Sequence, residues 1–391
     1  MSMLVRRYPK LAIRYIRIRA SASIGGKHSG STATNNIAEW GERWAFGECF
    51  DGPLDEPVDH ASYRPFGQLA AHDEAVNLSV GAHHTLTRRS GRTPRVASME
   101  AMHYLIGVDG GGSGTRVVLA DAQGVELAQA AGGASGLGLG IERAWQAIEA
   151  ACAQAFASAG RPFDWAHCGL ACGLAGVNNR DWLAAFLARA PQVAALDVQS
   201  DAYTTLIGAH AGEPGVIVAV GTGSIAAALD ANGGYRIAGG YGFPSGDEAS
   251  GAWIGLRAIV HAQQALDGRA ELDAFAGALL AQVGAADRDA LVLWLCEANQ
   301  TAYAGLAPVV LAHRDHRVAA ALLAQAGADI AALVDALDPA GTASVALCGG
   351  LAAPLAPYVP ASHRPRLRAP LADSAHGALE LARRAALRGA A

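Results

Sequence analysis

Short apolar runs joined by glycine-rich turns recur along the chain from residue 103 onward. The clearest example is residues 104–120, YLIGVDGGGSGTRVVLA, in which two apolar runs enclose four glycines. Apolar and β-branched residues favour strands, and glycine permits a sharp turn between them. Because the run after the turn is again β-branched and apolar, the pattern predicts a β-hairpin rather than a strand followed by a helix.

The same pattern returns later in the chain. Residues 216–220 and 225–229 predict two strands around a second glycine turn, and residues 344–348 predict a strand that runs into a third. Apolar runs and amphipathic spacing predict the remaining elements. These are strands at residues 167–177 and 196–200, and helices at 141–159, 180–189, 303–312 and 371–388.

The first two glycine turns are candidate phosphate-binding loops, because uncovered backbone N–H groups can approach a polyphosphate closely. The candidate residues are Gly110, Gly111, Gly112, Ser113, Gly114 and Thr115 in the first turn, and Gly221, Thr222, Gly223 and Ser224 in the second. Asp109 ends the first strand, where its carboxylate could hold a metal ion.

The same residues exclude two other nucleotide-binding folds. A Rossmann fingerprint requires a glycine loop that runs into a helix, whereas this loop returns as a strand. A P-loop requires a lysine after its last glycine, and the only lysines are Lys10 and Lys27, far upstream. Residues 103–391 therefore lack a Walker A lysine, a protein-kinase lysine and a lysine for a pyridoxal Schiff base.

Composition narrows the class of protein and of partner. The 391 residues are 51% hydrophobic and 17% charged, with a formal net charge of -5, which predicts a globular chain without a cationic field for nucleic acid or an anionic membrane. No apolar run reaches the roughly 18 residues of a membrane span. Six cysteines without C-x-x-C spacing favour a reducing compartment. We therefore expect a cytoplasmic protein that binds neither nucleic acid nor membrane.

Residues 1–98 differ from the rest of the chain. They hold both lysines, lack sustained periodicity and are rich in Ser, Thr, His and Arg. We expect this segment either to be disordered or to be an extension upstream of a true start at Met99, which stands just before the first predicted strand.

The ordered set of glycine turns resembles the superfamily of acetate and sugar kinases, heat-shock chaperones and actin, over residues 103–391. That resemblance implies an α/β fold with two ribonuclease-H-like, actin-like ATPase domains flanking a nucleotide cleft. The implied domains are residues 103–214 and 215–372, with the C-terminal helix 373–390 returning to the first. It also implies ATP and Mg²⁺ in the cleft, and makes Gly349 and Gly350 the adenosine loop.

Three segments narrow the resemblance to the bacterial glucosamine kinase and N-acetylglucosamine kinase branch. They are SDAYTTLIGAH from residue 200, VAVGTGSIAAAL from residue 218 and GGYGFPSGDEASGAWIGLRAI from residue 239. The resemblance implies an ATP-dependent kinase that phosphorylates glucosamine at its 6-hydroxyl, with N-acetylglucosamine as the alternative substrate. Because dimers are common in this family, a homodimer is one expectation.

Two carboxylates are the predicted centre of the chemistry. Asp201 follows a short strand and precedes the second half of the motif set, and a base there could orient the sugar hydroxyl and accept its proton. Asp109 is expected to approach Mg²⁺. The alternative interpretations are that Asp201 is a helix N-cap and that Asp109 only forms the turn.

The sugar-binding residues are less completely specified. Asp247, in the turn SGDEASG, resembles the family's contact to sugar hydroxyls, and a carboxylate is a suitable acceptor for them. A solvated acidic turn is the alternative. Where the family often has an asparagine after the first hairpin, this chain has Ala134, Ser135 and Gly136; either Ser135, with Gly136, substitutes for it or the pocket differs.

Two other functions remain as rivals. An ATP-driven activator of a radical dehydratase or reductase would use the same fold with an iron–sulfur cluster, but Cys168 and Cys172 do not match such a site convincingly. A sugar-sensing repressor would need a helix-turn-helix, and residues 1–98 show no such pattern. His313 and His316, three residues apart, could bind a metal, but a solvated helix end is the preferred interpretation.

Overall fold

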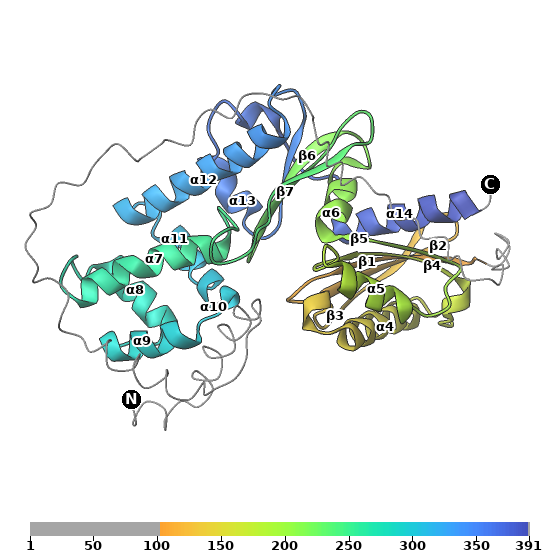
Figure 1. Ribbon diagram of the computed structural model, residues 1–391, viewed down its shortest axis with the longest axis horizontal. Helices are drawn as coiled ribbons and strands as arrows, with labels where there is room; N and C mark the ends of the chain where they lie inside the picture. The colour runs from red at the N-terminus through yellow and green to blue at the C-terminus, as the bar shows by residue number, and fades with distance from the viewer. Residues whose placement is uncertain (1–101, 390–391) are drawn as a thin grey trace, which may run out of the picture. The chain divides into compact units, whose positions relative to one another are not determined.

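The computed structural model describes residues 102–389, so the expectations for residues 1–98 lie outside the described residues. The described part contains two five-stranded mixed sheets, each covered by helices (Figure 1). The first sheet has the order β3-β2-β1-β4-β5. Its strands are β1 (Tyr104–Gly110), β2 (Thr115–Asp121), β3 (Glu126–Gly132), β4 (Cys168–Leu174) and β5 (Ala195–Ser200).

The first predicted hairpin is confirmed. Strand β1 pairs antiparallel with β2, in a register that sets Asp109 directly opposite Arg116, and β1 pairs in parallel with β4. Strand β4 in turn pairs in parallel with β5. The carboxyl ends of β1, β4 and β5 therefore lie at one edge of the sheet, which is where ligands bind in many α/β proteins.

The two faces of this sheet pack against different helices. Alternate side chains of a strand point to opposite faces. Ile106 and Val108 pack into a core with α4 (Ile141–Ser158), whereas Leu105 packs into another with α14 (Ser374–Gly389). In Figure 1, α4 and α14 lie on opposite sides of β1, β2 and β4.

The second sheet repeats the first. Its order is β10-β9-β6-β7-β8, which becomes the order of the first sheet when its strands are numbered from β6. The strands are β6 (Gly215–Val220), β7 (Ser224–Leu229), β8 (Tyr235–Gly239), β9 (Val345–Cys348) and β10 (Leu367–Arg368). Both sheets thus have the ribonuclease-H-like strand order, and the expected fold class is confirmed.

Helix α6 (Asp201–His210) stands between these two halves in sequence and packs against both. Its apolar residues form a core with Ile217, Ala227 and Ala346 of the second sheet, and the helix also contacts α14. Helix α14 packs in turn on β1 and β4 of the first sheet. The C-terminal helix therefore lies on the sheet formed by the amino-terminal part of the described chain.

The second sheet carries most of the remaining helices. The other α-helices are α5 (Arg180–Ala188), α7 (Gly251–Leu266), α8 (Ala274–Val283), α9 (Arg288–Glu297), α10 (Gln300–Ala304), α11 (Ala307–Ala312), α12 (Arg317–Leu337) and α13 (Ala352–Leu355). The prediction of one helix over residues 303–312 is wrong, because α10 ends at a cap on Gly305 and α11 begins after Leu306.

Helix α12 is the one described helix that meets, by length and composition alone, the criteria for crossing a membrane, although Asp329 and Asp335 interrupt its apolar sequence. Its apolar face packs in the core of the second sheet, where Leu323, Ile330 and Val334 are buried. The core helix of a globular domain meets the same length and composition criteria.

Candidate active site

A cleft of about 1020 Å³ gathers residues from both sheets and from α6 and α14. Four of the predicted site residues line it, namely Asp109, Asp201, Gly349 and Gly350. Both carboxylates stand at the carboxyl-terminal edge of the first sheet, Asp109 in β1 and Asp201 directly after β5. The parallel pairing through β4 is what brings them to the same edge.

Asp109 is held by Arg116, a residue that the sequence analysis did not single out. Arg116 donates to Asp109 Oδ2 from Nη2 at 2.7 Å and from Nε at 3.2 Å, and its Nη1 donates to Asp373 Oδ2 at 3.2 Å. The hydrogen bond to Asp109 raises the pKa of Arg116, so the guanidinium stays charged. The sequence did contain the information that pairs these two residues, because a hairpin whose turn is residues 111–114 places Asp109 directly opposite Arg116.

Asp201 is the first residue of α6 but not its cap. The N-cap is Ser200, whose Oγ accepts from the Tyr203 N–H at 3.2 Å, so the N-cap interpretation of Asp201 is wrong. Asp201 Oδ1 accepts from the Ala202 N–H at 2.9 Å. Burial raises the pKa of Asp201, and the negative charge of Asp109 raises it further, against the lowering effect of the backbone N–H groups.

The first glycine loop turns two carbonyl groups toward its own domain. Gly110 O accepts from Ala175 N at 2.9 Å, and Gly111 O accepts from Ser135 N and Gly136 N at 3.1 and 3.0 Å. In a trans peptide the N–H points opposite to the C=O. The N–H of Gly112, which shares a peptide unit with Gly111 O, therefore points away from the domain.

The second glycine loop is built in the same way on a helix. Gly221 O accepts from Gly251 N at 2.8 Å and Thr222 O from Ala252 N at 3.2 Å, both at the amino end of α7. The N–H groups of the same two peptide units, those of Thr222 and Gly223, consequently point away from α7. A Cβ added to Gly221 would meet no atom within 4 Å, so this face of the turn is open.

The third glycine turn lies beside the second. Gly349 has φ +87°, in the left-handed region that favours glycine. There is also no room for a side chain at this position, because an added Cβ would overlap Val220 O. An added Cβ on Gly350 would meet nothing within 4 Å. Gly349 is therefore required by the backbone, whereas Gly350 leaves open space in the cleft, which is the property expected of a surface against which a nucleotide base lies.

Of the residues predicted to contact the sugar, Asp201 lines the cleft, whereas Ser135, Gly136 and Asp247 are not among its lining residues. Ser135 is fully buried, with its Oγ 2.7 Å from Thr115 Oγ1, and Ser135 and Gly136 both bond to Gly111 O. Thr115 Oγ1 also donates to Gly133 O at 2.5 Å. In the structure, the hydroxyl groups of Thr115 and Ser135 and the N–H groups of Ser135 and Gly136 hold the first glycine loop in place. Contact of Ser135 and Gly136 with a sugar stays a prediction.

Asp247 lies against the second glycine loop. It is buried, has φ +59°, and accepts from Gln300 Nε2 at 2.7 Å. An added Cβ on Gly223 would lie 2.8 Å from Asp247 Oδ2. Burial raises the pKa of Asp247, against the lowering effect of hydrogen bonds from Ser224, Gly242 and Gln300. The solvated-turn alternative is wrong, and sugar binding by this carboxylate stays a prediction.

The family model for the BadF/BadG/BcrA/BcrD ATPases matches residues 106–380. The chain belongs to this ATPase family. The match begins in β1, which carries Asp109, and ends in α14, so it covers both sheets and every residue that lines the cleft. The expected resemblance is thereby confirmed.

Two relatives bear the names of amino-sugar kinases. The chain is 32% identical over 286 residues to glucosamine kinase GspK of Vibrio cholerae, covering 72% of this chain and 96% of that protein. It is 28% identical over 184 residues to the N-acetylmuramic acid/N-acetylglucosamine kinase of Clostridium acetobutylicum, covering 46% of this chain and 60% of that one.

A crystal structure is more similar still in sequence. A protein of Chromobacterium violaceum, provisionally named an N-acetylglucosamine kinase, is 49% identical and superimposes with a TM-score of 0.70, covering 72% of this chain and 99% of that chain. The matched share of this chain is close to the share that the structure describes. The match also covers nearly the whole of the Chromobacterium violaceum protein.

Proposed function

We propose that the protein is an ATP-dependent amino-sugar kinase that transfers the γ-phosphoryl group of ATP to the 6-hydroxyl of glucosamine. The observation that carries the proposal is the placement of Asp109 and Asp201 in one cleft with Gly349 and Gly350. Glycine turns with outward N–H groups adjoin that cleft, and the relatives are named amino-sugar kinases.

The residues of the cleft fit a magnesium–nucleotide complex. Asp109 and Asp201 are close enough that the charge of one raises the pKa of the other, so a cation between or beside them would relieve their repulsion. Mg²⁺ prefers one or two carboxylates together with phosphate oxygens. Asp109 would hold the ion, which supplies charge neutralisation of the phosphates when bound.

The N–H groups of Gly112, Thr222 and Gly223 would hold the phosphate oxygens. Gly221 O and Thr222 O bond to the amino end of α7, so the helix polarises these two peptide units in the direction that strengthens their N–H donors. A backbone cradle of this kind carries no net charge, and Arg116 and Arg368 are the arginines that line the cleft.

Asp201 would act as the general base. The 6-hydroxyl oxygen of the sugar forms the new bond to the γ-phosphorus while the bond from that phosphorus to the bridging oxygen of ADP breaks. The hydroxyl proton goes to the carboxylate of Asp201, which must be ionised to accept it. Its hydrogen bond from the Ala202 N–H keeps the carboxylate oriented.

The substrate panel is the first test. ADP release is measured with ATP and Mg²⁺ and, separately, glucosamine, N-acetylglucosamine, glucose and no sugar. Turnover with glucosamine far above the others supports the proposal, whereas preference for N-acetylglucosamine supports the alternative kinase. ADP release that is the same with every sugar and with none would refute an amino-sugar kinase.

The variant Asp201→Asn tests the base. We expect turnover to fall by roughly 10²- to 10⁴-fold, with ATP binding nearly unchanged, because the amide keeps the hydrogen bond but cannot accept the proton. The matched control is Asp181→Asn, an exposed aspartate in the first turn of α5, outside the cleft. Retained turnover in Asp201→Asn would refute the assignment.

The activator alternative gains no support from the cysteines. Cys168 and Cys172 are fully buried in β4, and burial raises the pKa of Cys168 to about 12 and that of Cys172 further. A cluster shared between two subunits needs ligands that reach the subunit surface. Both thiols are fully buried, so neither is placed for such a cluster. For the proposed kinase we expect a cytoplasmic location and, as in the family, a homodimer.

A further inference from the structure

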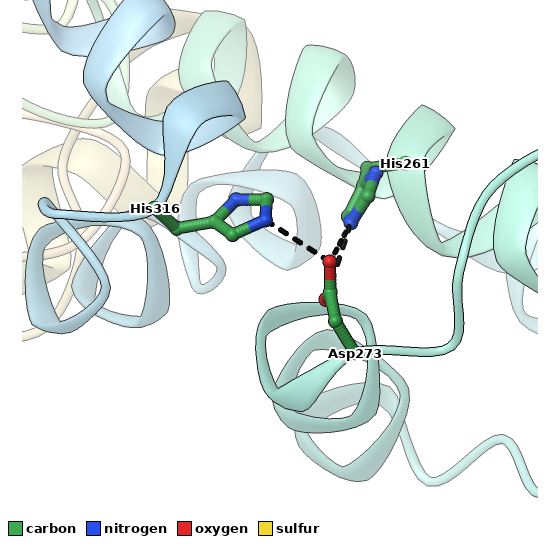
Figure 2. A group of neighbouring side chains, drawn as sticks. All are labelled: His261, Asp273 and His316. Carbon is green, nitrogen blue, oxygen red and sulfur yellow. Dashed lines mark hydrogen bonds and ion pairs between the residues drawn. The ribbon is translucent and has the colours of Figure 1, made fainter.

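Three side chains that are far apart in the sequence converge outside the cleft. His261 lies in α7, Asp273 is the N-cap of α8, and His316 is the N-cap of α12. Figure 2 shows both imidazoles directed at the same carboxylate. His261 Nε2 and His316 Nε2 each lie 3.0 Å from Asp273 Oδ2, and the three ligand atoms lie within 4.8 Å of one another.

Two of these three separations are close to those of a tetrahedral metal site. Zinc binds imidazole nitrogen and carboxylate oxygen at about 2.0–2.1 Å, so neighbouring ligand atoms of a tetrahedral site stand about 3.3 Å apart. The two nitrogen–oxygen distances of 3.0 Å therefore need to lengthen only slightly, whereas the two imidazole nitrogens, which lie within 4.8 Å of each other, would be drawn together by the ion. Each of the three ligand residues belongs to a helix or to its N-cap. The directions of their side chains are therefore set by helix packing rather than by a flexible loop.

The hydrogen bonds direct both histidines to one carboxylate. His261 Nε2 lies 3.0 Å from Asp273 Oδ2 and 3.2 Å from Oδ1, and His316 Nε2 lies 3.0 Å from the same Oδ2. If both rings were protonated, two cations would stand 5.1 Å apart, centroid to centroid. A divalent ion would replace both donated protons and use all three lone pairs at once.

The surroundings hold the ligands in place. Asp273 Oδ1 accepts from the Ala276 N–H at 2.8 Å, which orients the carboxylate and leaves Oδ2 toward the histidines. The ring of Phe275 packs against both, at 5.5 Å from His261 and 5.0 Å from His316. His261 is 5% exposed, whereas the side chains of Asp273 and His316 are each 24% exposed, so a water molecule can reach a fourth position.

We propose that His261, Asp273 and His316 bind a divalent transition-metal ion, with Zn²⁺ as its occupant. Two imidazoles and one carboxylate are ligands that zinc favours, whereas Mg²⁺ and Ca²⁺ favour oxygen. The site joins α7, α8 and α12 and lies outside the residues that line the cleft. The ion therefore stabilises the helical layer of the second sheet, and this role does not rest on the kinase activity.

His313 supplies a matched control. It packs on the same Phe275 ring at 5.4 Å, but its Nδ1 lies 2.8 Å from Val309 O and it does not belong to the three-residue group. Asp273→Asn is a second useful variant. Asparagine caps helices as well as aspartate does, so the cap on Ala276 is retained while the negative ligand is lost.

The experiment uses the full chain, treated with a chelator and then dialysed against ZnCl₂. Zinc content is measured by mass spectrometry and the midpoint of thermal unfolding by calorimetry. Because the chain has 13 histidines, the readout is the difference between variants. We expect His261→Ala, His316→Ala and Asp273→Asn to bind about one ion fewer per chain than the wild type and His313→Ala. Zinc should raise the midpoint of thermal unfolding only in the wild type and in His313→Ala.

A spectroscopic measurement identifies the ligand geometry. Co²⁺ in place of Zn²⁺ gives intense visible absorption when its coordination is tetrahedral, and we expect this absorption in the wild type and His313→Ala but not in Asp273→Asn. Equal zinc content in all five proteins, or a midpoint that zinc leaves unchanged in the wild type, would overturn the proposal and leave a hydrogen-bonded His–Asp–His array.

Discussion

The contact between α14 and α6 offers a test in which two physical effects predict opposite signs. Gly377 of α14 lies against the backbone of α6, so that an added Cβ would overlap Thr204 O and lie 2.6 Å from Gly208 N. Ordinary contacts of such an atom begin at 3.4 Å. Helix propensity alone predicts that Gly377→Ala stabilises the protein by about 1 kcal/mol.

Packing predicts the reverse. Overpacking typically costs about 1–3 kcal/mol, and the upper end applies here because both overlapping atoms belong to the backbone and cannot rotate away. Subtracting the gain in helix propensity leaves a net destabilisation of about 2 kcal/mol. For a protein of this size class, the midpoint of thermal unfolding would fall by about 4–8 °C.

The control is a glycine in an equally regular helix. Gly277 in α8 is exposed, and an added Cβ there would meet nothing within 4 Å. Gly277→Ala should therefore raise the free energy of unfolding by up to about 1 kcal/mol. Both variants are compared by calorimetry and by urea unfolding. If Gly377→Ala is as stable as the wild type or more stable, the close packing of α14 on α6 is refuted.

Three further predictions concern the cleft. Gly221→Ala should weaken ATP binding by about tenfold or more without lowering the unfolding midpoint, because its Cβ would enter the open space in which we propose that phosphate binds. Equal ATP affinity by calorimetry would contradict this. Burial raises the pKa of Asp201 above its usual 3.8, so kcat/KM should already fall with decreasing pH at values above pH 3.8. If the folded protein keeps a constant kcat/KM down to that pH, Asp201 is not the base. Arg116→Ala should lower kcat/KM for ATP by about tenfold or more, with partial recovery in Arg116→Lys, because a charged partner of Asp109 is removed; an unchanged steady-state rate would exclude this role.

The sequence predicted the parts of the site that depend on local pattern and on the order of the motifs. The glycine turns follow apolar strands, which is a signal confined to a few neighbouring residues. Asp109 and Asp201 were assigned to one site from the order of the glycine turns and the family resemblance. The structure gives the physical reason, because the parallel pairing of β1, β4 and β5 brings both residues to the same edge of the sheet. Ser200 as the cap of α6 was missed, because serine and aspartate next to each other are equally good N-caps.

Contacts between elements could not be predicted in the same way. The ion pair of Arg116 with Asp373 joins residues that no local pattern relates, and it depends on α14 packing against β1. The same holds for His316, which the spacing paired with His313, whereas the structure pairs it with His261 and Asp273. Side-chain clusters built from several helix ends are set by tertiary packing, which a single sequence does not reveal.

The two halves of the molecule share a strand order but contribute different chemistry. The residue before the first glycine turn is Asp109, whereas the residue before the second is Val220, which is fully buried. The second turn rests instead on the amino end of α7, through Gly221 O and Thr222 O. One half therefore offers carboxylates that suit a cation, and the other offers polarised N–H groups that suit an anion. A magnesium–phosphate group carries both charges, so this division of chemistry between unlike halves suits the complex that we propose for the cleft.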